Sequence, residues 1–181
     1  MAHAEQQRFV ASVRDQWPDF FSGTKVVEIG SLIINGSVRQ FFSSPLNYVG
    51  LDLADGPGVD VVCEGQNYDA ADGSFDCAIS AECFEHNPFW KQTFANMMRL
   101  VRDGGLVVMT CATHGRPEHG TSRSDRGSSP LTIDKGWEYY RNLGEEDFRS
   151  EWNFDELFSS YSFSSNEASH DLYFWGIKKA S

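Results

Sequence analysis

Short apolar runs alternate with polar turns along the first 112 residues of this chain. Residues 5–17 have the apolar spacing of one helix face, and Pro18 ends that pattern. The apolar positions are Phe9, Val10, Val13 and Trp17. Later apolar runs are short and nearly continuous, which is typical of buried strands. They predict strands at residues 25–29, 48–53, 59–63, 75–80 and 106–111.

Helices are predicted between some of these strands, at residues 36–42 and 88–101. The second has Pro88 at its start and Gly104 just beyond its end, which is the expected asymmetry. The linker 54–58 is short and rich in Gly and Pro, so the third strand should follow the second almost directly. The pattern predicts a parallel α/β sheet that is trimmed on one face.

The pattern changes after residue 111. Residues 112–131 carry almost no apolar side chains, and a loop of this length in a compact domain is either functional or disordered. Helices at 134–141 and 145–158 are predicted next, followed by two edge strands at 161–166 and 172–178.

A glycine turn follows the first strand, and a carboxylate ends the second. In parallel α/β sheets a glycine such as Gly30 lets the backbone approach an adenosine-containing ligand, and a strand-end acid such as Asp52 binds ribose hydroxyls. The next glycine is Gly36, so the dinucleotide pattern G-x-G-x-x-G is absent, as is G-x-x-x-x-G-K-[ST]. The spacing favours adenosine without phosphate, as in S-adenosylmethionine.

Six segments in order carry a resemblance to a known family. They are Glu28-x-Gly30, Asp52, residues 59–65, residues 73–80, Glu85-His86 and residues 100–106. Over residues 24–112 they resemble the motifs of class I S-adenosylmethionine-dependent methyltransferases of the small type 11 kind. The usual E-x-G-x-G-x-G is here Glu-Ile-Gly-Ser-Leu-Ile-Ile at 28–34, so the second glycine is missing and the methionine end would meet a different loop.

This resemblance implies a Rossmann-like three-layer α/β sandwich, with a mostly parallel sheet of about seven strands and an antiparallel C-terminal hairpin. The whole chain, 1–181, would be one S-adenosylmethionine-dependent methyltransferase domain with S-adenosylhomocysteine as the product. Its expected parts are an N-terminal helix (1–22), a cofactor-binding core (24–112), an acceptor-side loop and helices (113–160) and a closing hairpin (161–179).

Several strand-end residues are expected to bind the cofactor. Glu28 is an acid in a buried strand and needs a partner, for which a ligand or the next turn would serve. The resemblance places Glu64 and its neighbours against adenine, and Glu82 ends strand four at the ligand-binding edge. The expected set is Glu28, Gly30, Ser31, Leu32, Asn35, Asp52, Leu53, Glu64, Gly65, Gln66, Ser80, Ala81 and Glu82.

Two loop histidines are the candidates for catalysis. Methyl transfer needs alignment of acceptor, methyl and sulfur, plus a base when the acceptor is a hydroxyl. His119, and after it His114, follow strand five and could supply that base, although a loop histidine can also simply bond its own loop. His86 is interpreted as a structural cap or a pocket wall.

Four further residues are candidates for acceptor binding. Arg116 and Arg123 could hold a substrate carboxylate or phosphate, or be solvated loop charges. Trp137 and Tyr140 lie beside the polar loop, where an aromatic face could stack on a sugar ring.

The amino-acid composition limits the classes of molecule that this protein is expected to bind. With 26 acidic against 15 basic residues the net charge is -11, which disfavours nucleic acid and leaves small-molecule or glycan acceptors. The four cysteines form no C-x-x-C pair, so free thiols and no metal are expected. No apolar run long enough to span a bilayer and no secretory leader pattern occur, so a cytoplasmic protein without membrane insertion is expected. The oligomeric state is left open, with a homodimer through an edge strand or through the aromatic C-terminal tail as the alternatives.

The function predicted from the sequence is methyl transfer from S-adenosylmethionine to a small-molecule or glycan acceptor, at a hydroxyl oxygen. One alternative is a cofactor-binding module without turnover that acts through a protein partner. A second is an NAD-dependent oxidoreductase, which the missing second glycine argues against.

Overall fold

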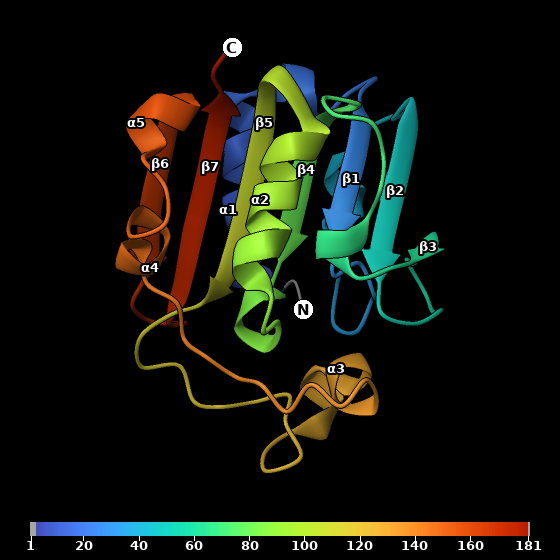
Figure 1. Cartoon of the computed structure of the whole chain (residues 1–181), viewed down its shortest axis with the longest axis vertical. Coiled ribbons are helices and arrows are strands. Elements are labelled where there is room, and N and C mark those ends of the chain that lie inside the picture. Colours follow the sequence, from blue (N-terminus) through green and yellow to red (C-terminus); the bar gives the residue numbers. More distant parts are fainter. Residues whose placement is uncertain (1–2, 181) are drawn as a thin grey trace.

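The computed structural model describes residues 3–180, and one seven-stranded sheet runs through it (Figure 1). The strands are β1 (Lys25–Ile29), β2 (Asn47–Asp52), β3 (Val61–Val62), β4 (Phe75–Ala81), β5 (Val101–Ala112), β6 (Phe158–Asn166) and β7 (Asp171–Lys178). Their order is β3-β2-β1-β4-β5-β7-β6, with β1 to β5 parallel and β7 antiparallel to both its neighbours. The predicted Rossmann-like sheet with an antiparallel C-terminal hairpin is confirmed.

Two helices cover opposite faces of the sheet, α1 (Ala4–Gln16) and α2 (Trp90–Leu100). Because side chains alternate along a strand, Val26 of β1 packs in the cluster that contains Val10 of α1, whereas Val27 packs in the cluster that contains Phe94 of α2. The helices predicted at residues 5–17 and 88–101 are therefore confirmed as α1 and α2.

Most other helical elements are short. They are α3 (Pro130–Asp134), α4 (Glu145–Arg149), α5 (Phe154–Leu157) and the 3-10 turns η1 (Pro18–Phe20), η2 (Arg39–Phe41), η3 (Gly65–Asn67), η4 (Phe84–His86) and η5 (Arg126–Ser128). Among residues 3–180, no helix combines the length and apolar character needed to cross a bilayer.

Three predicted elements differ from the structure: the helix at 36–42, the strand at 59–63 and the helix at 134–141. The helix expected at 36–42 is only η2, because the Ser37 hydroxyl accepts the Arg39 N–H at 3.1 Å and competes with helical bonding. The strand expected at 59–63 shrinks to β3 at the sheet edge. The helix expected at 134–141 is absent, because α3 ends before Gly136, whose φ of +83° is left-handed.

The helix expected at 145–158 is split into α4 and α5. The break lets Phe148 of α4 and Phe154 of α5, both essentially fully buried, join the same aromatic cluster around α2. Phe158, expected to end that helix, instead begins β6.

Residues 113–143, which we call the arm, leave the carboxyl end of β5 and return beside it. The Leu143 N–H donates to the Ala112 carbonyl at 3.0 Å, which closes the base of the arm. Figure 1 shows that its α3 lies beyond the carboxyl ends of β1, β2 and β4. The arm therefore covers the edge at which parallel sheets bind ligands.

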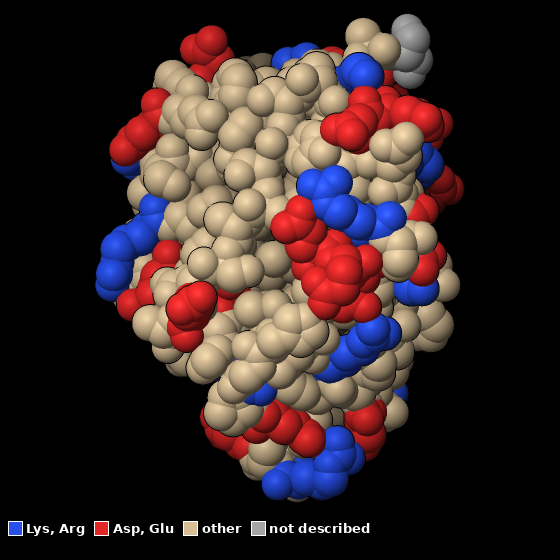
Figure 2. Space-filling view, turned by 90° about the vertical axis from the view of Figure 1, so that its left-hand side faces the viewer, with Lys and Arg blue, Asp and Glu red and all other residues tan. Residues whose placement is uncertain are grey.

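The sheet has two edge strands, β3 and β6. The longer of them, β6, contains no charged residue. Figure 2 shows the side of the molecule at which β6 lies, with a broad field free of charged side chains in its upper part. The homodimer through an edge strand stays a prediction.

Candidate active site

A pocket open to solvent, about 610 Å³ when its open mouth is included, lies between the strand ends and the arm. It sits where the chain order reverses between β1 and β4, the usual binding crevice of an open α/β sheet. Its lining residues are Ile29, Gly30, Leu32, Ile34, Leu51, Asp52, Leu53, Cys63, Glu82, Cys83, His86, Asn87, Ser128, Ser129, Pro130, Leu131, Thr132 and Trp137.

The glycine turn after β1 is fixed by its surroundings. Gly30 has φ +78°, and a Cβ there would lie 2.8 Å from the Cβ of Cys83. The Gly30 and Ser31 N–H groups both donate to the Leu51 carbonyl, at 2.9 and 3.0 Å. Only glycine fits this position, and its bare backbone forms part of the pocket wall.

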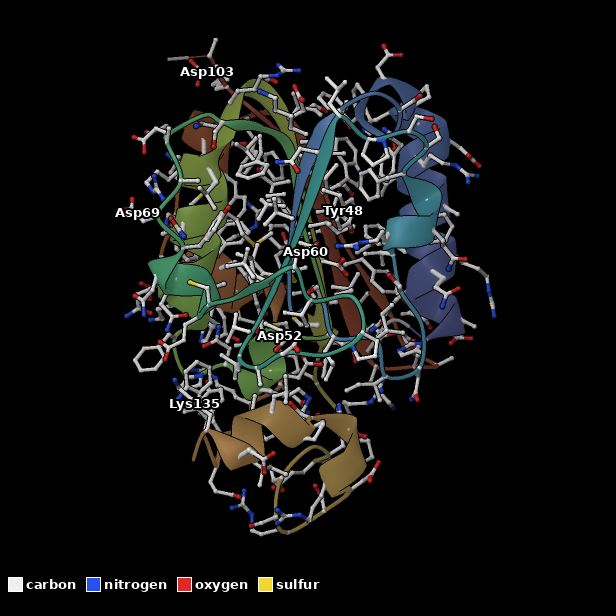
Figure 3. The ribbon with its side chains drawn as sticks, turned by 90° about the vertical axis from the view of Figure 1, so that its right-hand side faces the viewer. Tyr48, Asp52, Asp60, Asp69, Asp103 and Lys135 are labelled. Carbon is white, nitrogen blue, oxygen red and sulfur yellow. The ribbon has the colours of Figure 1, made fainter. Side chains whose placement is uncertain are left out.

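The residues that replace the second glycine form an apolar wall. Leu32 and Ile34 line the pocket, and the Leu32 N–H donates to Asp52 Oδ2 at 2.9 Å. The other Asp52 oxygen accepts the Leu53 N–H at 2.8 Å. Burial raises the pKa of Asp52. Figure 3 shows Asp52 at the end of β2 that faces the arm.

Glu28 lies outside the pocket, although the sequence placed it in the cofactor site. Its carboxylate accepts a hydrogen bond from the Tyr48 hydroxyl at 2.7 Å, and the Arg39 guanidinium stacks 4.3 Å from the Tyr48 ring centre. Arg39 also pairs with Asp60 (Figure 3). Burial raises the pKa of Glu28 to about 7, against the opposing effect of the Tyr48 hydrogen bond. Glu28 therefore joins β1 to β2.

The other expected cofactor residues divide between the pocket and its supports. Gly30, Leu32, Asp52, Leu53 and Glu82 line the pocket. Outside its lining are Ser31, Asn35, Glu64, Gly65, Gln66, Ser80 and Ala81.

Several of the residues outside the lining support it. The Ser80 hydroxyl donates to the Ile29 carbonyl at 2.9 Å, beneath the glycine turn. Glu64 pairs with Lys135 of the arm at 2.8 Å, and Figure 3 shows Lys135 at the boundary between the arm and the core. Glu64 therefore links the core to the cover of the pocket.

Two buried acids lie at the floor of the site. Glu82 has φ +52°, an uncommon conformation for a residue with a side chain, and its N–H donates to the Thr110 carbonyl at 2.9 Å. Burial and the neighbouring carboxyl of Glu85 raise the pKa of Glu82 well above its usual range. Burial also raises the pKa of Glu85.

One histidine lines the pocket and a second packs against it from outside the lining. His86 lines the pocket, and burial lowers its pKa to about 3, so its imidazole is neutral. The His119 ring lies 4.8 Å from that of His86, and its Nδ1 is 3.0 Å from the Pro117 carbonyl. Burial lowers the pKa of His119 as well. Tyr140 packs on both rings, at 5.5 and 4.9 Å.

Three of the other expected residues do not line the pocket, although Arg116 lies 3.7 Å from the carboxylate of Glu82, which does. His114 is exposed and contacts Glu146, with Nε2 2.6 Å from its carboxylate. Arg116 donates to the carboxylate of Asp171 at 3.0 Å and to the Ser169 carbonyl. Arg123 pairs with Glu118 on the surface of the arm. Neither arginine lines the pocket.

Trp137 lines the pocket and contacts Phe89, with ring centres 5.4 Å apart. Sequence reasoning missed the following lining residues: Ile29, Ile34, Leu51, Cys63, Cys83, Asn87 and the arm residues 128–132. The signal for the arm residues was Pro130-Leu131, the first apolar pair after a polar stretch, with Pro at a helix start.

Comparisons with known proteins agree with this architecture. A family model described as "Methyltransferase domain" matches residues 37–109, from the segment before η2 into β5. A search of curated proteins found no match to this chain.

Solved structures with the same fold include proteins with diverse substrates. The 1,6-didemethyltoxoflavin N1-methyltransferase of Burkholderia thailandensis, bound to 1,6-didemethyltoxoflavin and S-adenosylhomocysteine, is 14% identical, with TM-score 0.62 over 96% of this chain and 78% of its own. Phosphoethanolamine N-methyltransferase 2 of Haemonchus contortus, with S-adenosyl-L-methionine, is 13% identical, with TM-score 0.65 over 96% and 53%. The YcgJ protein of Bacillus subtilis is 11% identical, with TM-score 0.63 over 96% and 100%. At these identities the likeness concerns the fold.

Proposed function

We propose that this chain, which belongs to the type 11 family of class I S-adenosylmethionine-dependent methyltransferases, methylates a hydroxyl oxygen of a small-molecule or glycan acceptor. The observation that carries the proposal is the pocket at the β1–β4 crevice, whose lining includes Gly30, Asp52 and His86, with His119 packed against His86 just outside the lining. The part of the pocket at Gly30 and Asp52 suits adenosine, and the part at His86 suits a neutral acceptor.

Asp52 is the proposed ribose ligand. Each of its carboxylate oxygens accepts one backbone N–H, and a carboxylate oxygen has room for a second hydrogen bond. Two ribose hydroxyls could therefore donate to Asp52 without displacing the bonds to Leu32 and Leu53. The apolar side chains of Leu32 and Ile34 support a cofactor that carries no phosphate near this turn.

The acceptor would lie between the cofactor and the pair of His86 and His119. Its oxygen attacks the methyl carbon as the carbon–sulfur bond breaks, and S-adenosylhomocysteine leaves. The hydroxyl proton moves to Nε2 of His119, because Nδ1 of that ring bonds the Pro117 carbonyl. His114 is left out of this proposal because it lies on the surface with Glu146.

The charge of the pocket supports a neutral acceptor. Its described lining contains Asp52 and Glu82 and no Lys or Arg. Arg116 and Arg123, the candidates for holding an anionic group, are already paired with carboxylates: Arg116 with Asp171 and, at 3.7 Å, Glu82, and Arg123 with Glu118. Trp137 supplies an aromatic face on which a sugar or another ring could stack.

Calorimetric titration tests the cofactor site. We expect S-adenosylmethionine and S-adenosylhomocysteine to bind and NAD not to bind. Asp52→Asn should weaken binding by roughly 10-fold or more, since hydrogen bonds to a charged group contribute about 1.5–3 kcal/mol. Asp55→Asn, on the exposed linker three residues later, is the matched control. Equal affinities for the two variants would contradict the assignment, and binding of NAD alone would overturn the proposal.

Turnover with a panel of neutral hydroxylated acceptors tests the reaction. The methylated atom would be identified by mass spectrometry and NMR of the product. His119→Ala should lower the rate by about 100-fold with cofactor affinity intact. Methylation at nitrogen or carbon would refute the oxygen assignment, and cofactor binding with no turnover on any acceptor would favour the binding-module alternative.

A further inference from the structure

Three potential metal ligands converge beside the pocket from two separate segments. Glu85 and His86 belong to η4, directly after β4, and His119 belongs to the arm. One ligand atom of each residue lies within 4.8 Å of the ligand atoms of the other two. We propose that Glu85, His86 and His119 form a binding site for one divalent transition-metal cation.

Burial gives the first support for a ligand at this point. Glu85 is fully buried and His86 is 3% exposed. The Glu85 carboxyl has only weak hydrogen bonds, with the backbone of Glu85 and Ala112 and with the Glu82 side chain, and Nδ1 of His86 has no hydrogen-bond partner among the described residues. The one ion-pair contact of Glu85 there is His86, at 4.0 Å. A buried carboxylate is costly unless a cation or good donors compensate it, and a metal ion would do so.

The orientation of His119 gives the second support. Its Nδ1 lies 3.0 Å from the Pro117 carbonyl, so the proton sits on Nδ1 and Nε2 carries the lone pair. A metal-binding histidine usually donates its other N–H to a carbonyl or carboxylate in this way. Tyr140 also restricts the His119 ring. Its own ring packs against His119, and its hydroxyl donates to the same Pro117 carbonyl at 3.1 Å.

A second cluster of potential metal ligands differs from the first because protein cations already pair with its Asp171 carboxylate. His3, Glu82 and Asp171 also bring ligand atoms within 4.8 Å of one another. There, however, Arg116 donates to Asp171 at 3.0 Å, and Nε2 of His3 lies 3.2 Å from its other oxygen. Protein cations already compensate that carboxylate, so the second cluster has no need of a metal.

The donor set indicates the class of metal. Two imidazoles and one carboxylate suit Zn²⁺, Fe²⁺, Co²⁺ or Ni²⁺, whereas Mg²⁺ and Ca²⁺ prefer oxygen ligands. Three protein ligands leave at least one coordination position for water or substrate.

This inference deepens the proposed function and rests on it for the role of the metal. Because His86 also lines the pocket, the cation would bind at the acceptor end. There it would coordinate the acceptor hydroxyl and lower its pKa. In the metal-loaded protein the cation, rather than His119, would thus promote loss of the hydroxyl proton, which passes to solvent before the oxygen attacks the methyl carbon.

Metal titration of untagged, chelator-treated protein tests the site. Zn²⁺ binding is measured by calorimetry, and Co²⁺ binding by its visible absorption, which reports coordination by histidine. We expect one ion per chain. His119→Ala and Glu85→Gln should each weaken binding by about 10- to 100-fold or more. His114→Ala, an exposed histidine of the same arm, should bind like the wild type.

Two controls distinguish a failed metal site from a misfolded variant and from a failed cofactor site. The half-exposed His119 can be replaced with little risk to folding, so its variant remains informative if Glu85→Gln fails to fold. S-adenosylhomocysteine affinity, measured on the same chelated samples, tests the cofactor proposal independently of the metal. No stoichiometric binding by the wild type, or binding that His119→Ala leaves unchanged, would overturn the metal site.

Discussion

Among single residues, the buried acid Glu28 forms a hydrogen bond that joins two neighbouring strands of the sheet. Glu28 accepts the Tyr48 hydroxyl at 2.7 Å, and burial raises its pKa to about 7. The sequence correctly marked Glu28 as an acid in a buried strand that needs a partner. The sequence could not show that the partner is Tyr48, 20 residues further along the chain, because the pairing of β1 with β2 determines which side chains meet.

This raised pKa predicts a pH-dependent stability. The unfolded chain loses the Glu28 proton near pH 4.5 and the folded chain near pH 7, so the folded state binds more protons between these values. Stability should therefore fall as pH rises through that window, by about 3 kcal/mol in total. Glu28→Gln should remove the dependence and be more stable than the wild type at pH 8.

Urea unfolding at pH 4.5 and pH 8 measures this effect. Glu167→Gln, on the exposed turn between β6 and β7, is the control and should behave like the wild type. A Glu28→Gln variant less stable than the wild type at pH 8 would mean that the folded protein prefers the ionised carboxylate.

The glycine turn allows a matched pair of substitutions. Gly30 and Gly23 both have left-handed φ values, +78° and +65°, but a Cβ meets Cys83 at 2.8 Å at Gly30 and nothing within 4 Å at Gly23. Gly23→Ala should cost about 1 kcal/mol for its conformation. Gly30→Ala should cost about 3 kcal/mol and weaken S-adenosylhomocysteine binding. Equal losses of stability in thermal unfolding would refute the tight packing at Gly30.

At the scale of elements, strands were predicted better than helices. The five parallel strands are marked by apolar runs, and β1 matches its expected bounds. The helices after β5 were misplaced because their apolar residues serve one shared aromatic cluster, with Phe148 and Phe154 entering from two short helices. Gly136 could have signalled the end of α3, since a left-handed glycine commonly terminates a helix.

The contact between the arm and the core should influence cofactor affinity. Lys135 follows α3 and pairs with Glu64 before η3 at 2.8 Å, with both side chains partly exposed. Exposed ion pairs contribute about 0–1 kcal/mol, so Lys135→Ala should weaken S-adenosylhomocysteine binding by up to about 5-fold. Overall stability should hardly change.

A second exposed pair provides the comparison. Lys91 pairs with Glu151 on the α2 side of the molecule, and neither residue lines the pocket, so Lys91→Ala should leave cofactor affinity unchanged. Calorimetry of both variants at low and high salt measures the difference. An equal effect of the two substitutions would show that the arm contact has no special influence on the pocket.

At the scale of the whole molecule, buried charges join parts that are distant in the sequence. Arg116 of the arm bonds Asp171 at the start of β7, and Nε2 of His3, before α1, contacts the same carboxylate at 3.2 Å. Burial opposes ionisation of Asp171, but hydrogen bonds from His3 and Ser169 lower its pKa below the usual range. The arginine that the sequence offered for substrate binding therefore holds the arm to the sheet.

Removing Arg116 should destabilise the protein strongly. Asp171 is fully buried, and loss of one partner of a buried pair costs about 3 kcal/mol. Arg116→Ala should thus lower the unfolding midpoint in urea, whereas Arg123→Ala, on the exposed surface of the arm, should change it little. A stable Arg116→Ala variant with only weakened acceptor binding would restore the substrate role expected from the sequence.

The sequence anticipated the pocket lining more completely at the proposed cofactor end than at the proposed acceptor end. Gly30 and Asp52 lie at strand ends, where local pattern and position in the sheet coincide. The acceptor end joins η4 to residues of the arm that follow more than thirty positions later, and an irregular loop has no periodicity from which its path could be inferred. His119 and Tyr140 were identified by their chemistry, and His86 as a wall.

The closure of the arm at its base has a consequence for how such a protein can diversify. Because the arm leaves the sheet at Ala112 and rejoins it at Leu143, its interior can change in length without altering strand order, provided that the contacts of Arg116 with Asp171 and of Lys135 with Glu64 are kept. The sheet is the constant part of the molecule, and the arm segments between these contacts are the variable part. Changes confined to those segments would alter the cover of the pocket while the strand ends that carry Gly30 and Asp52 stay the same.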